Sequence, residues 1–570
     1  MRLQISKTKN ASSFYVVEST YDKNGKRSNK IVEKLGTLAE LQKIHEDPVA
    51  WAKEYVAELT EKKKNENIKV RIDYNPSARI DRNKNTLYNG GYLFIQKLYH
   101  KYGLDKICKA ITKKYEFEYD LNSILSRLIY GRILSPSSKM STMEYSKTLL
   151  EKPNFELHQI YRALGVLAKE SNYIQAQLYQ NSKAVSSRND SILYYDCTNF
   201  FFEIEEESGL RQYGVSKEHR PNPIVEMGMF IDGDGVPLAF CINPGNTNEQ
   251  QTLRPLEHQI IRDFGKSKFV ICTDAGLSSI ANRKFNAIQS RAFITVQSIK
   301  KMPDYQKAWA LGNNGWKLQG AKETYTLDYI KGNRELYEDK TFYKEDFFND
   351  NGIEQRYIVT FSLKYMDYLK NVRERQIQRA QKTIDMGLDK KNSSNDPYRF
   401  VGQLYFDDNG EIVERHKLYL NEDKIRGEEV YDGFYCVATN LCDSADLILK
   451  VNAKRWEIEE SFRIMKSEFK SRPVFLSRDD RIKAHFLTCF LALFIFRNFE
   501  KVLNSQFTAS DLIKTLKQML FQEIPRDGYI PVYTRNDITD LIHSSFGIYT
   551  DYQFITMSDM RKIFTNSKKS

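Results

Sequence analysis

Apolar residues recur every three or four positions in the segment from Val451 to Lys470, and this spacing predicts one helix with a buried face. Because each residue of a helix turns the chain by about 100°, Arg455, Glu459 and Lys466 fall on one edge of that face. Glu–Lys neighbours on an exposed helix would be a simple alternative, since they stabilise a helix only slightly. A carboxylate between two cations at the rim of a buried face instead indicates a functional site.

Two upstream aspartates lie in strand-like patterns. The segment Ser191–Ile204 is aromatic and β-branched on both sides and predicts a central strand that contains Asp196. A buried carboxylate in such a strand needs a cation, a metal or several donors, unless the strand is an edge strand or ends in a turn there. The apolar strand Phe269–Cys272 ends just before Asp274, ahead of a helix predicted over Ser278–Ile288. Asp274 is either the N-cap of that helix or a site residue at a strand end.

The order of the predicted elements suggests how these acids meet. Val225–Ile242 predicts a hairpin that turns at Asp234-Gly235, and a helix at Leu253–Phe264 and a strand at Ala292–Ile299 follow. With acids on the first strand, the fourth strand and a late helix, this order predicts an α/β fold with an RNase H-like nuclease core. Two divalent ions held by such acids stabilise both oxygens of an in-line phosphoryl displacement. Mg²⁺ prefers oxygen ligands, so Asp and Glu suffice.

These motifs resemble those of the DDE transposases of bacterial insertion sequences, in the branch with a β-rich insertion before the glutamate and a Y-x2-R-x3-E-x6-K signature. Arg455, Glu459 and Lys466 match the signature spacing, whereas Asn452 stands at the Tyr position. The resemblance continues in segments ordered along the chain: YYDCT around Asp196, YGVSKEHRPNP (Tyr213–Pro223), INPGNTNEQ (Ile242–Gln250), TDAGLSS around Asp274, DGFYCVATN (Asp432–Asn440) and RPVFLSRDDRIKAHF (Arg472–Phe486).

The resemblance implies a function for each matching residue. Asp196, Asp274 and Glu459 would be the catalytic metal ligands, holding Mg²⁺ or Mn²⁺, with two ions expected. Arg455 and Lys466 would grip DNA phosphates near the scissile bond, the first in a bidentate manner and the second as a point charge.

The resemblance also implies partners and further contacts. Lys217 and Arg220 are candidate phosphate contacts in the Tyr213–Pro223 loop. The expected partner is double-stranded DNA, as the element ends and the target, and a homodimer is expected when DNA is bound.

Other polar and aromatic residues near these motifs have simpler interpretations. Glu457 and Glu460 are predicted to point toward solvent. Trp456 is predicted to pack in the core or between domains, with base stacking as the alternative. His219 and His485 are predicted to pack or to form hydrogen bonds rather than to act as catalysts.

The pattern divides the chain into several regions, and turn signals at Asn24-Gly25, Asn351-Gly352 and Asn409-Gly410 mark hairpins within them. We expect a small N-terminal β-unit, a helical N-terminal domain that binds DNA or serves as a scaffold, the catalytic core in two parts, a β-rich insertion between them, and a C-terminal segment that could carry a dimer contact. Their predicted bounds are 1–60, 77–185, 190–300 with 432–500, 301–431 and 501–570, respectively.

Composition agrees with a polyanionic partner. Lys and Arg total 86 against 74 acidic residues, which gives a net charge of +12 and a pI near 9.0. The seven cysteines lack metal-binding spacing and suggest reduced thiols of a cytoplasmic protein. The apolar run Ala484–Phe496 is too short to span a bilayer, so no membrane partner is expected. Gly265-Lys266-Ser267 lacks the earlier glycine of a P-loop, so no nucleotide cofactor is expected.

Two alternatives to a transposase remain at this stage. A site-specific nuclease without strand transfer would use the same acids. A catalytically silent DNA-binding regulatory derivative is permitted by Asn452, although the chain retains all three acids.

Overall fold

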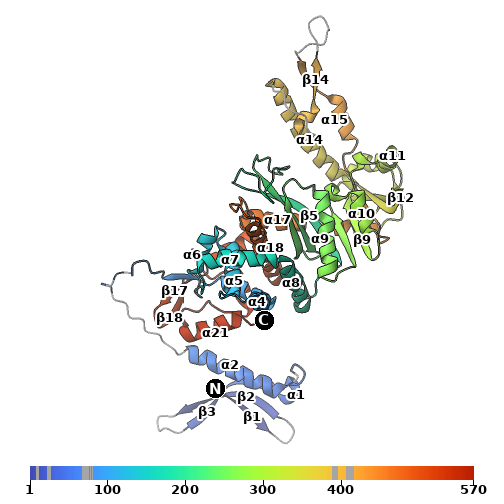
Figure 1. The fold of residues 1–570 in the computed structure, drawn as a ribbon. Coiled ribbons are helices and arrows are strands. Elements are labelled where there is room, and N and C mark those ends of the chain that lie inside the picture. Colours follow the sequence, from blue (N-terminus) through green and yellow to red (C-terminus); the bar gives the residue numbers. More distant parts are fainter. Residues whose placement is uncertain are drawn as a thin grey trace. The chain divides into compact units, whose positions relative to one another are not determined.

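The computed structural model describes residues 1–7, 12–21, 27–45, 47–66, 76–77, 79, 81–387, 396–405 and 416–569. The chain forms two compact units, Met1–Lys84 and Asn85–Ser570. Figure 1 shows the helices and strands of both.

The N-terminal unit is a small antiparallel sheet with two helices. Its strands pair in the order β1-β2-β3, and Phe14, Leu41 and Ala52 form the centre of its core. The turn predicted at Asn24-Gly25 lies outside the described residues. The elements are β1 (Arg2–Lys7), β2 (Ser12–Tyr21), β3 (Arg27–Thr37), α1 (Leu38–Leu41) and α2 (Pro48–Glu66).

The segment predicted to be helical opens the second unit. Side-chain caps start two of its helices: Asp120 accepts a hydrogen bond from the backbone N–H of Ser123, and Ser138 from that of Ser141. The helices are α3 (Tyr92–Lys101), α4 (Leu104–Tyr115), α5 (Leu121–Leu134), α6 (Lys139–Ser146), α7 (Leu157–Lys169) and α8 (Ser171–Val185).

A ten-stranded sheet forms the centre of the second unit, in the order β11-β10-β12-β13-β16-β9-β8-β5-β6-β7. β5 runs parallel to β8, and β8 parallel to β9, whereas β6 and β7 form the predicted hairpin. At its turn, Gly235 adopts a φ of 76°, which a side chain would disfavour. The elements of this part are β5 (Ile192–Phe201), β6 (Ile224–Asp232), β7 (Pro237–Pro244), α9 (Glu249–Asp263), β8 (Phe269–Thr273), α10 (Ile280–Asn286) and β9 (Arg291–Val296).

Helices cover both faces of this sheet near β5 (Figure 1). Side chains alternate along the strand: Tyr195 and Cys197 pack with α9, whereas Tyr194 and Phe200 belong to the cluster around α18 (Asp479–Val502). β5 is therefore a central strand, as its apolar sequence predicted.

The predicted insertion extends the same sheet. β12 and β13 pair through a turn at Asn351-Gly352, as predicted, and β13 joins β16, which pairs antiparallel with β9. The turn predicted at Asn409-Gly410 lies outside the described residues. The elements are α11 (Asp304–Leu311), β10 (Trp316–Leu318), β11 (Thr324–Tyr325), α12 (Leu327–Gly332), α13 (Arg334–Tyr337), β12 (Thr341–Asp350), β13 (Ile353–Ser362), α14 (Leu363–Asp385), β14 (Val401–Tyr405), β15 (His416–Leu420), α15 (Glu422–Glu429) and β16 (Phe434–Thr439).

The prediction of one continuous helix over Val451–Lys470 is wrong. The chain forms α16 (Ala445–Ala453), then α17 (Trp456–Arg463), and then a π-helical turn at Ile464–Glu468. At the break, the Arg455 N–H bonds the carbonyl three residues back, and the Tyr194 hydroxyl donates to the Val451 carbonyl at 2.9 Å. That carbonyl would accept the Arg455 N–H in a regular α-helix, so a contact with β5 replaces a helical bond.

The C-terminal segment packs against the helical region rather than standing alone. Strands of this segment join the short strand β4 (Leu87–Asn89) in a sheet of order β19-β18-β17-β4. Among the described residues, α18 is the one helix long and apolar enough to cross a membrane by composition, but 89% of its apolar window is buried inside the protein. The other elements are α19 (Ala509–Gln518), β17 (Leu520–Ile524), β18 (Gly528–Pro531), α20 (Asp537–Phe546), β19 (Ile555–Thr556) and α21 (Met557–Ser567).

Candidate active site

The two aspartates lie next to each other on neighbouring parallel strands. Tyr195 on β5 pairs in parallel register with Thr273 on β8, and Asp196 and Asp274 each follow these residues directly. Asp274 follows the end of β8, whereas Asp196 lies within β5, which continues to Phe201. The fold therefore brings together two acids that are separated widely in the sequence.

Arg455 connects this edge to the glutamate of α17. Its Nη1 atom lies 3.5 Å from Asp274 Oδ1 and 3.6 Å from Glu459 Oε1. The Arg455 side chain is 19% exposed, whereas that of Glu459 is 59% exposed. A mostly buried guanidinium thus holds one acid from the sheet and one from the helix, and leaves the Glu459 carboxylate open to solvent.

Asp196 carries the clearest electrostatic signal of the three acids. Burial raises the pKa of its carboxyl to about 6, and the nearby charge of Asp274 also raises it. Lys217, the Cys197 N–H and Arg455 oppose this rise without cancelling it. A buried carboxylate beside a second acid is stabilised by an added cation, so the donor set of hard oxygens suits a divalent ion such as Mg²⁺ or Mn²⁺.

Lys466 does not share one helix edge with Glu459, as the sequence predicted, but contacts Thr198 and Glu218. Its Nζ donates to Thr198 Oγ1 at 2.6 Å and lies 3.7 Å from Glu218 Oε1. Burial, followed by the charge of Lys217, lowers the pKa of its ammonium group to about 8. The π-helical turn accounts for the difference, because it begins after Glu459, contains Lys466 and changes the angular spacing along the chain.

The two cations predicted in the Tyr213–Pro223 loop differ in their surroundings. Lys217 Nζ donates to the Cys197 carbonyl at 2.6 Å and forms an ion pair with Glu249 at 2.7 Å. Arg220 is half-exposed and lies over the Phe201 ring at 4.3 Å. Lys217 therefore supports the strand that carries Asp196, whereas Arg220 is available to a partner.

A cavity of about 390 Å³ adjoins Glu459 and contains a residue that sequence reasoning missed. Tyr435 of β16 lines it, and the Tyr435 hydroxyl accepts a hydrogen bond from the Asn452 amide at 2.9 Å. Asn452, at the signature Tyr position, thus holds another tyrosine near Arg455. No local pattern marks Tyr435, because its position depends on the pairing of β16 with β9.

Glu226 is a second missed residue. It is buried on β6, and burial followed by the charge of Glu249 raises the pKa of its carboxyl to about 7. Within the described part of the chain, the Asn199 amide donates a hydrogen bond to its carboxylate at 3.4 Å. A glutamate inside the apolar run of β6 is the same kind of signal that singled out Asp196, so the sequence could have indicated it.

Two predictions about α17 are wrong. Trp456 is 55% exposed and lines the cavity beside Glu459 instead of packing in a core. Glu457 does not point freely to solvent, since it forms an ion pair with Arg497. Both differences follow from the break before Trp456, which reorients the start of α17.

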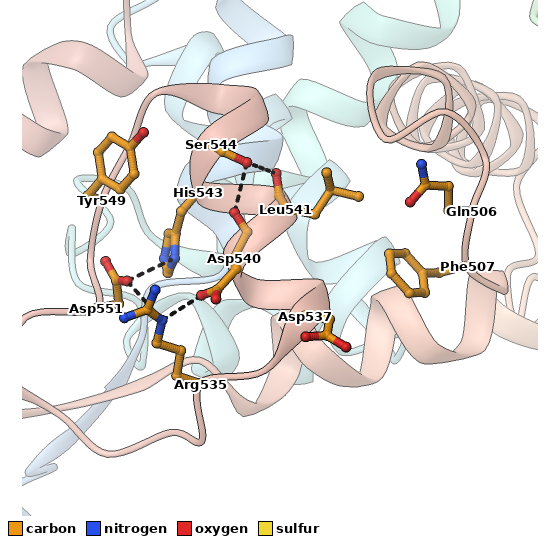
Figure 2. Close-up of a pocket in the computed structure, with 10 residues that line it drawn as sticks. All are labelled: Gln506, Phe507, Arg535, Asp537, Asp540, Leu541, His543, Ser544, Tyr549 and Asp551. Atoms are coloured by element: carbon orange, nitrogen blue, oxygen red, sulfur yellow. Dashed lines mark hydrogen bonds and ion pairs between the residues drawn. The ribbon is translucent and has the colours of Figure 1, made fainter.

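A separate acidic cluster lies in the C-terminal segment (Figure 2). Asp540, His543 and Asp551 form the one trio within the described ranges whose ligand atoms all lie within 4.8 Å of one another. Arg535 Nε already lies 2.6 Å from Asp540 and 3.5 Å from Asp551. A guanidinium therefore offsets part of the negative charge of the cluster, and its cavity of about 550 Å³ contains none of the predicted site residues.

The comparisons with known proteins identify the family. The family described as "Transposase DDE domain" matches residues 206–495, half of the chain, and the chain belongs to this family of transposases. A search of curated proteins found no match.

Two solved structures show weak similarity to the chain. A piggyBac transposase synaptic complex with hairpin DNA is 9% identical with a TM-score of 0.36, covering 86% of this chain and 87% of that one. A Mos1 transposase paired-end complex with the left transposon end is 13% identical with a TM-score of 0.13, covering 40% and 63%. At these scores neither structure defines the fold or the chemistry of this chain.

Proposed function

We propose that this transposase binds the ends of an insertion sequence and catalyses metal-dependent DNA strand cleavage and strand transfer. The observation that carries the proposal is that Arg455 pairs with both Asp274 and Glu459, while the parallel register of β5 and β8 places Asp196 beside Asp274. Two acids on parallel strands and a third acid on a helix form an arrangement that suits phosphoryl transfer with hard metal ions.

The strand order supports an RNase H-like core. The part β7-β6-β5-β8-β9 has an antiparallel meander followed by two parallel strands. Asp196 lies on its first strand, Asp274 follows its fourth, and Glu459 lies on a helix beyond the inserted strands β10–β13. We infer that the insertion extends the catalytic sheet and helps to line the site, since Thr341 and Thr360 share the cavity with Glu459.

Asp196, Asp274 and Glu459 would hold two Mg²⁺ or Mn²⁺ ions. When bound, these ions supply Lewis acidity at the scissile phosphate and lower the pKa of attacking water. The half-exposed Glu459 leaves one side of the site open to a DNA strand.

The cations of the site have separate tasks in this proposal. Arg455 aligns Asp274 and Glu459 and can offer its remaining N–H donors to a phosphate oxygen. Lys466 provides a point charge next to β5, and Arg220 contacts the backbone further out. Positioning and electrostatic stabilisation are the protein's main contributions to phosphoryl transfer.

Cleavage of a labelled duplex that carries the flanking element's end tests the proposal. Wild type should form a 3′-OH with Mg²⁺ and none with EDTA, and Glu459→Gln should abolish the product while retaining DNA binding. Glu460→Gln is the matched control, because this neighbouring acid pairs with Arg463 instead. Binding without cleavage by the wild type, across several ends and metals, would favour a silent DNA-binding derivative.

Strand transfer needs its own assay. A pre-cut end with a free 3′-OH should be joined to target DNA by the wild type and not by Glu459→Gln. A nuclease without transfer would cut the intact end and leave the pre-cut end unjoined. We also propose that the DNA-bound form is a homodimer, which the mass of the purified protein–DNA complex measures directly.

A further inference from the structure

A cavity of about 400 Å³ lies between the helical region and the segment that follows the Glu459 helices. The turn from α5 to α6 forms one wall, α7 and α18 contribute Tyr161 and His485, and the segment Lys470–Leu476 closes the other side. Among the described residues that line it, none is acidic. We call this cavity the basic pocket, after its cations Arg132, Lys139, Lys470 and Arg472.

Two of the cations are deeply buried. Arg132 is 5% exposed and Lys139 is 6% exposed. A buried charge without a counter-charge or a full set of hydrogen bonds is costly. The pocket therefore holds positive charge in a place where the fold alone does not stabilise it.

The hydrogen bonds of Arg132 satisfy only part of its guanidinium. Nη1 donates to the Phe469 carbonyl at 3.0 Å, and Nη2 lies 3.5 Å from His485 Nδ1. Its Nε is buried without a partner in the described part of the chain. Burial and the charges of Arg132 and Lys139 lower the pKa of His485, which leaves that imidazole neutral.

Lys139 has no acidic partner within the described residues. Its ammonium group forms neither a hydrogen bond nor an ion pair with them. Burial, followed by repulsion from Arg132, lowers its pKa to about 7. Arg472 differs, because it forms an ion pair with Glu218. Lys139 and Arg132 thus lack an acidic partner among the described residues.

The backbone adds donors at the same place. Lys139 is the first residue of α6, and Ser137 and Ser138 line the pocket just before it. The Ser138 side chain already caps the N–H of Ser141, so the N–H groups of Lys139 and Met140 are the ones that lack an intrahelical acceptor and favour an anion. Two buried cations and a helix N-terminus together match the charge and the several oxygen acceptors of a phosphate group.

We propose that the basic pocket binds a phosphate group, and that a backbone phosphate of bound DNA fills it during function. Free inorganic phosphate shares this chemistry and is the second possible source. The choice of DNA rests on the proposed function. It also rests on the pocket wall Lys470–Leu476, because this segment comes shortly after the π-helical turn that carries Lys466, a proposed phosphate contact. The site is distinct from the acids, because no candidate metal ligand lines it.

The first experiment measures phosphate binding without DNA. The thermal midpoint of the full chain is followed as phosphate replaces chloride at constant ionic strength, and radiolabelled phosphate is bound in equilibrium dialysis. Wild type should gain stability in step with phosphate concentration and retain label, whereas Lys139→Met should do neither. Lys147→Met, at the other end of α6 and paired with Glu144 on the surface, is the control and should behave as wild type.

Equal phosphate responses in wild type and Lys139→Met would overturn the site. Lys139→Gln is a second variant, so that misfolding of one substitution does not decide the result. Neither readout requires DNA or metal, so this experiment is independent of the proposed catalytic function.

The second experiment identifies the source of the phosphate. Duplex binding is measured in EDTA over a range of salt concentrations, for wild type, Lys139→Met and Lys147→Met. If DNA fills the pocket, Lys139→Met should reduce the slope of log K against log salt by about one and weaken binding to all sequences. A slope equal to that of Lys147→Met would assign the pocket to free phosphate alone. A wild type that binds no duplex would overturn the proposed function while leaving the phosphate site intact.

Discussion

The candidate active site and the basic pocket handle buried charge in opposite ways. At the active site, Arg455 lies within 3.6 Å of two acids, and Lys217 and Lys466 are tied to β5 and its neighbours. In the basic pocket, the positive charges of Arg132 and Lys139 repel each other, and no acid of the described chain lines the cavity. The first region is an almost balanced network that divalent ions would complete in the proposed function, whereas the second is an unbalanced cluster that an anion would complete. Substitutions should therefore affect chemistry in the first region and stability or binding in the second.

The largest effect should come from removing an acid. Asp196→Ala, Asp274→Ala or Glu459→Gln should lower the cleavage rate by more than about 10³-fold, which corresponds to about 4 kcal/mol in the barrier. Each would remove one of the proposed oxygen ligands of the metal ions, and duplex affinity measured in EDTA should stay close to that of wild type. Undiminished cleavage by any purified single variant would remove that acid from the catalytic set.

The next largest effect should be a gain in stability. Lys139→Met removes a buried, unpartnered cation, and the shift of its pKa from 10.5 to about 7 corresponds to a gain on the order of 4 kcal/mol near neutral pH. Since the folded pKa is depressed, the unfolded chain binds more protons between about pH 7 and 10.5. Wild-type stability should thus rise with pH through this window, and the gain of the variant should shrink.

Thermal midpoints of wild type and Lys139→Met are measured at pH 6.5, 8 and 9.5, which roughly cover the window between the two pKa values. The difference between the two midpoints should become smaller as the pH rises. Lys147→Met provides the baseline, because its exposed ammonium pairs only with Glu144. A gain in Lys139→Met that is the same at every pH would mean that the apolar side chain packs better, without any relief of buried charge.

A smaller effect is expected at the missed tyrosine. Tyr435→Phe removes the hydroxyl that accepts the Asn452 amide hydrogen bond. The loss should be about 1 kcal/mol, or roughly five-fold in the cleavage rate, if the hydroxyl orients Arg455 through Asn452 and β16. Single-turnover cleavage measures it, with Tyr419→Phe on the β14–β15 hairpin as the control. Equal rates for both variants would leave Tyr435 with a packing role.

The smallest effect should come from the exposed loop. Arg220 is half-exposed over Phe201, so Arg220→Gln should weaken duplex binding uniformly and lower the salt slope by about one, with the cleavage chemistry unchanged. Filter binding over a salt series measures this slope. A change in cleavage by pre-bound enzyme would move Arg220 closer to the reacting phosphate than its present position indicates.

Local patterns predicted the strands around the two aspartates well. Asp196 and Asp274 stood out because a carboxylate is unexpected in or directly after an apolar strand, and the hairpin at Gly235 followed from a turn dipeptide. These signals depend on neighbours in sequence, which a single chain displays directly.

Long-range contacts account for what the sequence did not predict. The helix from Val451 breaks because the Tyr194 hydroxyl, far away on β5, binds its carbonyl. That break exposes Trp456, and the π-helical turn that follows Glu459 changes the position of Lys466. Tyr435 reaches Asn452 through the pairing of β16 with β9. The basic pocket was hidden for the same reason, since Lys139 and His485 come from helices far apart in the sequence.

The adjacency of β9 and β16 has a consequence for the order in which the protein is made. β9 ends at Val296 and its sheet neighbour β16 begins at Phe434, so the ribosome must complete the whole insertion before this pairing closes. Glu459 is translated later still. A nascent chain with both aspartates in place therefore lacks the third acid, and its β9 edge remains open to other strands. Catalytic competence is in this way postponed until most of the chain has left the ribosome, and translation that stops early yields a chain without the glutamate.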